Sequence, residues 1–215
     1  MSCYRLLLAV FLALSHLGSA LAADKRPSLL VMGDSLSAAY GLNLDDGWVS
    51  LLARKLQAEG SRWRVINASI TGETTAGGAA RIDQELNLHH PQWLIIELGT
   101  NDGLRGLPLA LARDNLDRMI RAAKASGARV LLLGMRIPPN YGADYSEAFQ
   151  TLYVDLAKRH DLPLLPFLLA PIATDRGYFL EDNLHPNAAA QPLLLAHVWT
   201  VLAPLLKPGT VGRPR

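Results

Sequence analysis

The sequence predicts a single α/β domain in which helices cover both faces of a parallel sheet. Short, continuous apolar runs alternate along the chain with longer stretches whose apolar residues recur at helical spacing. Strands that are buried on both faces take this form, because neither side of the sheet meets water. No internal repeat or long linker divides the chain, and its hydrophobic content of 50% is ample for one core.

The elements follow one another regularly along the chain. The expected strands are residues 28–32, 63–67, 93–98, 129–133 and 162–165, and the expected helices are residues 47–59, 76–88, 109–124, 146–160 and part of 187–205. The helix at 109–124 has the clearest pattern, since its apolar residues fall on one face and Gly127 follows as a C-cap signal. Pro192 is expected to bend or restart the last helix, because proline removes a backbone donor.

The first residues have the features of a secretory signal peptide. Arg5 precedes a short apolar run at 6–14, and small residues follow up to Ala22. The apolar run is too short to span a bilayer as a helix, so cleavage after Ala22 or Ala23 is expected. We therefore predict a signal peptide at 1–22, a folded domain at 23–206 and a flexible tail at 207–215, with the mature protein periplasmic or secreted.

The charge and the cysteine content exclude several classes of protein. The formal net charge of +2 falls by one when Arg5 leaves with the signal peptide, which gives no electrostatic case for binding nucleic acid or an anionic membrane. The single cysteine, Cys3, lies before the predicted cleavage site. The mature chain is thus expected to have no disulfide and no thiol nucleophile.

A serine directly follows the first predicted strand, in the segment Gly33-Asp34-Ser35. A serine at a strand-to-helix junction has its hydroxyl near helix-terminal N–H groups, which favour developing negative charge. By itself the segment is equally typical of a simple helix cap.

Near the C-terminus, Asp182 lies three residues before His185. At this spacing a carboxylate can hold the imidazole tautomer whose Nε2 is free to accept a proton from a serine. A metal-binding pair or a purely structural pair remains an alternative. The chain order serine, aspartate, histidine is one of the known orders of a catalytic triad.

Two further loops follow predicted strands and carry candidate donors. Gly72 follows the second strand and offers a backbone N–H, and Asn101 follows the third strand and offers a side-chain amide. Each loop alone could be an ordinary turn. Because sites in open α/β sheets form at the carboxyl ends of the strands, we expect Ser35, Gly72 and Asn101 to lie close together.

Three acidic residues in or beside these segments invite a structural interpretation. Glu97 lies inside an apolar strand and must have a buried partner if it faces the core. Asp34 is expected to support the serine turn, and Asp102 to shape the loop that carries Asn101.

His89 and His90 are adjacent, so that their side chains point in different directions, and no metal site is expected there.

The four blocks at 33–36, Gly72, 99–102 and 182–185 together resemble the signature blocks of the SGNH (GDSL) hydrolase superfamily. Segments 65–70, 96–106 and 138–142 resemble its bacterial periplasmic branch of multifunctional thioesterase I/lysophospholipase/arylesterase proteins. The resemblance covers nearly the whole predicted mature chain. It implies a flavodoxin-like three-layer α/β/α sandwich with a five-stranded parallel sheet.

The resemblance also implies roles for individual residues. Ser35 would be the nucleophile and His185 the base, with Asp182 orienting the histidine. The oxyanion hole would consist of the Ser35 and Gly72 backbone N–H groups and the Asn101 side chain. A mobile segment at 103–108 would contact the acyl chain, and the loop at 138–145 would line the same groove. The substrate-binding residues expected in these two loops are Leu104, Arg105, Gly106, Leu107, Pro108, Pro139 and Tyr141.

The activity expected from the resemblance is a serine esterase that hydrolyses carboxylic esters and thioesters through an acyl-enzyme. It would act as a monomer on small-molecule acyl substrates, with no metal or organic cofactor. An acetyl esterase acting on carbohydrate is the alternative within the same fold. A catalytically silent binding domain is the alternative from another class of protein.

Overall fold

The computed structural model describes residues 26–207, apart from the side chain of Pro139. The predicted signal peptide at 1–22 and the predicted tail beyond Lys207 lie outside the described residues. Within 26–207, no helix is both long and apolar enough to cross a membrane.

The core of the molecule is a five-stranded parallel sheet in the order β2-β1-β3-β4-β5. The strands are β1 (Ser28–Gly33), β2 (Arg64–Asn67), β3 (Trp93–Glu97), β4 (Arg129–Leu133) and β5 (Leu164–Leu165). Every residue of β1 and β3 is buried, which agrees with their continuous apolar sequences. The predicted α/β class and the five parallel strands are thereby confirmed.

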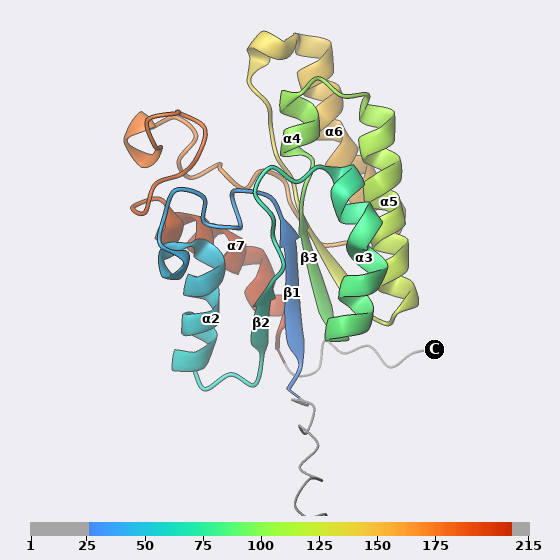
Figure 1. Ribbon diagram of the computed structural model, residues 1–215, viewed down its shortest axis with the longest axis vertical. Helices are drawn as coiled ribbons and strands as arrows, with labels where there is room; N and C mark the ends of the chain where they lie inside the picture. Colours follow the sequence, from blue (N-terminus) through green and yellow to red (C-terminus); the bar gives the residue numbers. More distant parts are fainter. Residues whose placement is uncertain (1–25, 208–215) are drawn as a thin grey trace, which may run out of the picture.

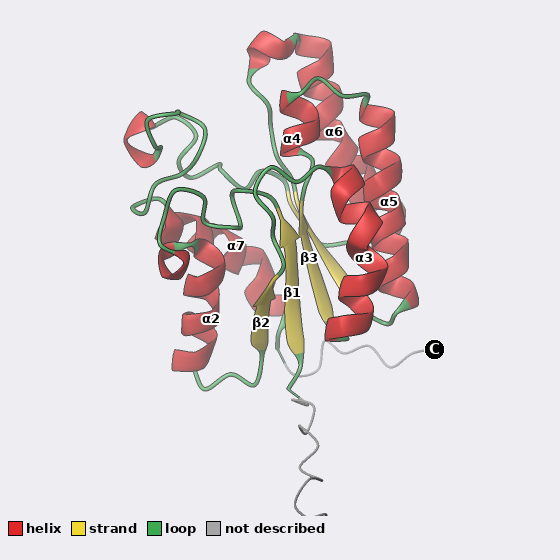
Figure 2. Ribbon diagram, in the orientation of Figure 1, coloured by secondary structure: helices red, strands yellow, loops and turns green. Residues whose placement is uncertain are grey.

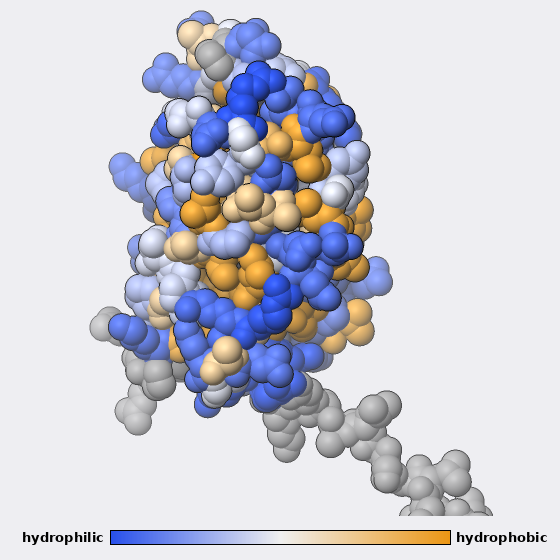
Figure 3. All heavy atoms as spheres, turned by 90° about the vertical axis from the view of Figure 1, so that its left-hand side faces the viewer, coloured by the Kyte–Doolittle hydropathy of each residue, from blue (hydrophilic) through white to orange (hydrophobic). Residues whose placement is uncertain are grey.

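Helices pack on both faces of the sheet, so the fold has three layers (Figure 1, Figure 2). Helices α2 and α7 cover one face, and α3, α5 and α6 cover the other (Figure 1). The helices are α2 (Trp48–Ala58), α3 (Thr75–His89), α4 (Thr100–Leu104), α5 (Leu109–Ala125), α6 (Ala143–His160) and α7 (Gln191–Leu205). On the side that carries α2 and α7, hydrophobic and hydrophilic residues are interspersed over the surface (Figure 3).

Two predicted boundaries differ from the structure by more than one residue and one predicted bend is absent, each for a local reason. Strand β5 begins at Leu164 and not at Leu162, because the N–H of Leu162 donates to Ala157 and closes the end of α6. Helix α6 begins at Ala143, three residues earlier than expected, after Gly142 with φ +96°. Pro192 neither bends nor restarts α7, since that helix begins at Gln191 and a proline is tolerated in the first turn.

The strand order decides where loops can meet. Strands β2 and β3 flank β1, so the chain reverses its direction of progress across the sheet between β1 and β3. Loops that leave the carboxyl ends of strands on the two sides of such a point diverge and leave a crevice. The segments after β1 and β2 carry Ser35 and Gly72, and Asn101 lies in the short helix α4 that follows β3, where the sequence had suggested a loop.

Candidate active site

A continuous chain of hydrogen bonds joins Ser35, His185 and Asp182. The Oγ atom of Ser35 lies 2.9 Å from Nε2 of His185, and Nδ1 of that ring lies 2.6 Å from Oδ2 of Asp182. A hydroxyl, an imidazole and a carboxylate are therefore hydrogen-bonded in the order in which acyl transfer by a serine uses a nucleophile, a base and an orienting group.

The loop that carries Asp182 and His185 is closed by its own backbone. Phe179 and Pro186 form an antiparallel bridge, and the N–H of Leu180 donates to the carbonyl of His185 at 2.8 Å. Oδ1 of Asp182 accepts the N–H groups of Leu184 and His185 at 2.9 and 3.0 Å. Partial desolvation raises the pKa of Asp182, but these N–H groups and the His185 ring outweigh it and lower the pKa to about 2.

Ser35 lies in a tight turn, and no regular helix begins at it as the sequence had suggested. The N–H of Ala38 donates to the carbonyl of Asp34 at 2.9 Å, but Ala39 then adopts a positive φ of 58° and ends the helical path. Oδ1 of Asp34 accepts the N–H of Leu36 at 3.0 Å, which supports the turn as expected.

Glu97 has a buried partner that the sequence could not identify. Its Oε2 accepts the hydroxyl of Ser37 at 2.7 Å and lies 3.4 Å from the N–H of Asp34. A Cβ atom on Gly33 would come within 2.7 Å of the same Glu97 oxygen, so only glycine fits at this position. Glu97 therefore holds the serine turn from beneath.

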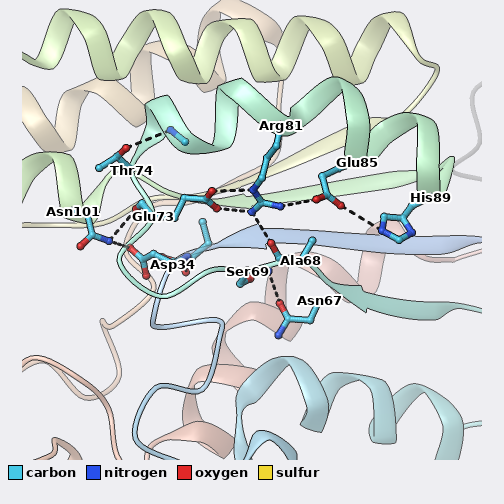
Figure 4. Close-up of polar contacts among 12 residues, drawn as sticks. Asp34, Asn67, Ala68, Ser69, Glu73, Thr74, Arg81, Glu85, His89 and Asn101 are labelled. Atoms are coloured by element: carbon cyan, nitrogen blue, oxygen red, sulfur yellow. Dashed lines mark hydrogen bonds and ion pairs between the residues drawn. The ribbon is translucent and has the colours of Figure 1, made fainter.

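The two predicted donors outside the serine turn are the backbone N–H of Gly72 and the side-chain amide of Asn101, and they lie in neighbouring segments. Nδ2 of Asn101 donates to the backbone carbonyl of Glu73 at 3.0 Å and to Oδ2 of Asp34 at 3.1 Å (Figure 4). Gly72, with φ +78°, is the third residue of a turn closed by the Glu73 N–H and the Ile70 carbonyl. That conformation suits glycine, because a side chain is strained at positive φ.

Asp102 shapes the same region, as expected. Its carboxylate accepts both the backbone N–H and the hydroxyl of Thr75, at 2.8 and 2.6 Å. Thr75 is the first residue of α3 and Asp102 lies in α4. These two bonds therefore tie the start of α3, after the β2 loop, to the short helix after β3.

Asp34 and Glu97 form a buried pair of carboxyl groups next to the serine turn. They are 1% and 0% exposed. Burial raises the pKa of Asp34 to about 6, despite the lowering effects of the Leu36 N–H and the charge of His185. Burial and the neighbouring charge of Asp34 raise the pKa of Glu97 well above its ordinary value. Both carboxyl groups are thus harder to ionise in the folded chain than in water.

We expect Glu97→Gln to raise the melting temperature at alkaline pH. A group whose pKa is raised by folding binds more protons in the folded state, so its contribution to stability falls as the pH rises above its unfolded pKa. A neutral amide of the same size removes this loss. At about pH 8 the variant should melt a few degrees above the wild type, since 1 kcal/mol corresponds to about 2–4 °C for a domain of this size.

Melting curves of the wild type and of Glu97→Gln at about pH 5 and about pH 8 test this expectation. The gain in melting temperature should be smaller at the acidic pH, because there the carboxyl group of Glu97 in the wild type is protonated and, like the amide, uncharged. Glu59→Gln is the matched control, since Glu59 is 46% exposed and pairs with Lys55 on the surface. A gain that is equal at both values of pH would contradict the buried, protonated state of Glu97.

An apolar cavity of about 520 Å³ opens beside Ser35 and His185. Its size is within the range of small-molecule sites in proteins. Its walls come from the loops after β1, β3 and β4 and from the segment that precedes α7. The apolar residues that line it are Leu36, Leu104, Met135, Ile137, Pro138, Phe167, Leu169, Ala173, Phe179 and Leu184.

Of the residues expected to bind substrate, Leu104 lines the cavity, and Arg105, Gly106, Leu107, Pro108 and Tyr141 lie outside its lining. The guanidinium of Arg105 instead donates to the carbonyl of Gly72 at 3.1 Å. The hydroxyl of Tyr141 donates to the carbonyl of Leu104 at 3.0 Å, so the two predicted loops contact each other. The side chain of Pro139 lies outside what the structure describes. Beyond Gly142, the predicted loop at 138–145 is the first turn of α6.

The sequence did not point to Tyr40, whose ring lies against that of His185. The ring centroids of Tyr40 and His185 are 4.3 Å apart, with an angle of 41° between the planes. The N–H of Tyr40 donates to the carbonyl of Ser35, which brings the ring to this position. Nothing in the local pattern distinguishes this tyrosine from any other exposed aromatic residue.

In the part of the chain that the structure describes, no group of three or more histidine, cysteine or acidic side chains is placed to hold a metal ion. The two adjacent histidines have separate roles: His89 lies 3.4 Å from Glu85, and His90 ends α3 in the left-handed conformation.

The chain is similar to known proteins over most of its length. Residues 31–192 match the model of the GDSL-like Lipase/Acylhydrolase family. The chain is 48% identical to the Esterase TesA of Pseudomonas aeruginosa over 94% of this chain and 98% of that protein. It is 41% identical to the Thioesterase 1/protease 1/lysophospholipase L1 of Escherichia coli, over 87% of each chain.

The fold is also similar to solved structures. The psychrotrophic esterase EstA of Pseudoalteromonas sp., solved in a form inhibited by monoethylphosphonate, superposes with a TM-score of 0.81 at 40% identity. The match covers 83% of this chain and 98% of that one. Sequence, fold and relatives lead to one conclusion: this chain belongs to the GDSL-like lipase/acylhydrolase family and is an ester-bond hydrolase of the SGNH type.

Proposed function

We propose that the protein is a serine esterase that hydrolyses carboxylic esters and thioesters of apolar acyl groups through an acyl-enzyme on Ser35. The observation that carries the proposal is the hydrogen-bonded chain from Ser35 through His185 to Asp182 beside an apolar cavity. Two relatives are named as an esterase and as a thioesterase and lysophospholipase, which supports the hydrolysis of both oxygen esters and thioesters.

In the proposed reaction, Ser35 Oγ attacks the carbonyl carbon while Nε2 of His185 takes the hydroxyl proton. The Asp182 carboxylate accepts a hydrogen bond from Nδ1–H and stabilises the imidazolium that forms. The protonated His185 then gives its proton to the leaving alcohol or thiol. Water attacks the acyl-enzyme with His185 again as base, which releases the acid and restores Ser35.

The tetrahedral oxyanion is proposed to rest on the N–H groups of Ser35 and Gly72 and on the Asn101 amide. In the resting site the Asn101 amide has Asp34 and Glu73 as partners, and these contacts fix its orientation before substrate arrives. Donors that are oriented in advance stabilise charge without reorganising during the reaction.

The walls of the cavity favour acyl chains longer than acetyl, and so favour a lipid-type ester over an acetylated carbohydrate. Each methylene that is buried contributes about 0.8 kcal/mol, which corresponds to about a fourfold gain in kcat/KM. With p-nitrophenyl esters, kcat/KM is therefore expected to rise from acetyl towards medium-chain acyl groups and to level off once the cavity is filled.

Hydrolysis of a p-nitrophenyl ester series from acetyl to palmitoyl tests this proposal, with acetyl-xylan assayed in parallel. A preference for acetyl groups together with turnover of acetyl-xylan would favour the carbohydrate esterase. If no ester is turned over and a fluorophosphonate forms no adduct, the chain is a silent binding domain and the proposal fails.

We further propose that the enzyme acts outside the cytoplasm, on the basis of the predicted signal peptide at 1–22. Acyl-CoA is not expected there, so oxygen esters such as lysophospholipids are the proposed cellular substrates. Thioester hydrolysis would then reflect the shared acyl-enzyme chemistry.

A further inference from the structure

The loop between β2 and α3 connects both proposed oxyanion donors outside the serine turn. It contains Gly72, and the carbonyl of the next residue, Glu73, accepts the Asn101 amide at 3.0 Å. The start of this loop runs beside β1, where the N–H of Ala68 donates to Val31 and that of Ile70 donates to Gly33. A shift of residues 72 and 73 would therefore displace the Gly72 N–H and the Asn101 amide together.

A ladder of charged and polar side chains runs from this loop along one face of α3 (Figure 4). Its members, four or eight residues apart, are Glu73, Arg81, Glu85 and His89. The position between the first two is Gly77, where a Cβ atom would come within 3.2 Å of the Glu73 side chain. The missing side chain at Gly77 leaves the space through which Glu73 reaches Arg81.

Arg81 grips the loop at two points. Its Nε donates to Oε1 of Glu73 at 2.9 Å, and its Nη2 donates to the other oxygen of the same carboxylate. The same Nη2 also donates to the carbonyl of Ala68 at 2.5 Å. The guanidinium thus joins the beginning of the loop, at Ala68, to its end, at Glu73.

The position of Arg81 is itself fixed and largely shielded from water. Nη1 donates to Oε1 of Glu85 at 2.9 Å, one turn further along α3. The side chains of Arg81 and Glu73 are only 16% and 6% exposed. A two-point pair of this kind constrains geometry more than a surface ion pair does, and removing one partner leaves the other charge buried.

We propose that Arg81 is a positioning residue for the oxyanion hole, which sets the Gly72 N–H through the loop and the Asn101 amide through the Glu73 carbonyl. The inference rests on the proposed function, because it assigns a role within the same reaction. Arg81 is not among the residues that line the cavity, and its hydrogen bonds go to Glu73, Glu85 and Ala68, so it acts through these neighbours.

The test is the turnover of p-nitrophenyl butyrate by Arg81→Met and Arg81→Lys. A displaced donor stabilises the oxyanion of the transition state less well and affects the binding of the ester less. Arg81→Met should therefore lower kcat by about 10- to 100-fold, with KM changed by less than about twofold. Arg81→Lys should lose less, since it keeps the charge but not the two-pronged geometry. Arg118→Met is the matched control: it removes the exposed pair of Arg118 with Asp83 on α3 and should keep the wild-type kcat.

Combination with Asn101→Ala separates positioning from general stabilisation. If Arg81 acts through the oxyanion hole, the double variant should lose much less than the product of the two single losses in kcat. Losses that multiply, or a wild-type kcat in folded Arg81→Met, would overturn the inference. If Arg81→Met does not fold, Glu73→Gln serves in its place, and an unchanged kcat in that variant overturns the inference equally.

The failure of the inference is distinguishable from the failure of the proposed function. If Asn101→Ala lowers kcat and Arg81→Met does not, only the role of Arg81 is wrong. If Ser35→Ala retains wild-type turnover, the proposed mechanism itself is wrong, and the inference falls with it.

Discussion

Ser35→Ala is expected to lower kcat for p-nitrophenyl butyrate by at least about 10⁴-fold, because no other group can form the acyl-enzyme. The substitution removes one oxygen atom, whose hydrogen-bond partner is His185 at 2.9 Å. The serine turn is held by other contacts, through Asp34 and Glu97, so the fold should survive. Steady-state turnover and a melting curve of each protein measure the two effects separately.

Ser126→Ala is the matched control for this experiment. Its hydroxyl donates to the carbonyl of Ala123 at the C-terminal end of α5, near the opposite edge of the sheet. It should keep wild-type turnover. The fluorophosphonate adduct should form on the wild type and on Ser126→Ala, and not on Ser35→Ala. Equal turnover by the wild type and Ser35→Ala would mean that Ser35 is not the nucleophile.

Asp182→Asn is expected to lower kcat by about 10⁴-fold while leaving the loop in place. An amide oxygen at Oδ1 can still accept the N–H groups of Leu184 and His185. The amide nitrogen, however, would present N–H to Nδ1 of His185, where the wild-type carboxylate accepts a hydrogen bond at 2.6 Å. The ring would then carry its proton on Nε2, and that nitrogen could no longer take the proton of Ser35.

The pH profile gives a second readout of Asp182. The pKa of Asp182 is depressed to about 2 in the folded chain. The contribution of its carboxylate to stability is therefore complete above its ordinary pKa and is lost only as the pH falls through about 2. Protonation of Asp182 therefore should not limit wild-type activity above about pH 4. Asp175→Asn is the matched control, because Asp175 caps the nearby short helix through Gly177 without touching His185. More than about a tenth of wild-type activity in Asp182→Asn would contradict the assigned role.

Several features of the fold follow from local sequence and could be predicted. The apolar runs gave four of the five strands to within a residue at each end, because a strand buried on both faces has no polar position. The spacing of Asp182 and His185 is equally local, since the two residues are only three positions apart in the chain. The short β5 was overestimated, because a helix end and a strand start share the apolar residues around Leu162.

Other features depend on which elements become neighbours, and local patterns do not contain that information. Ser35 and His185 are 150 positions apart, and Glu97 meets its partner Ser37 across 60 positions. The resemblance of the four blocks to a known family pointed to the first of these contacts. It did not reveal the partner of Glu97 or the ring of Tyr40 against His185.

The sequence by itself determined the α/β class, the approximate strands and helices, and the set of residues from which an ester hydrolase site could be built. The tertiary structure alone decided the cavity walls, where Met135 from the loop after β4 meets Phe167 and Phe179 from the segment between β5 and α7. It also decided that Arg81 reaches across from α3 to the loop at Ala68. The physical reason is that periodicity reports only whether a side chain is buried, whereas its neighbours depend on the order of strands in the sheet.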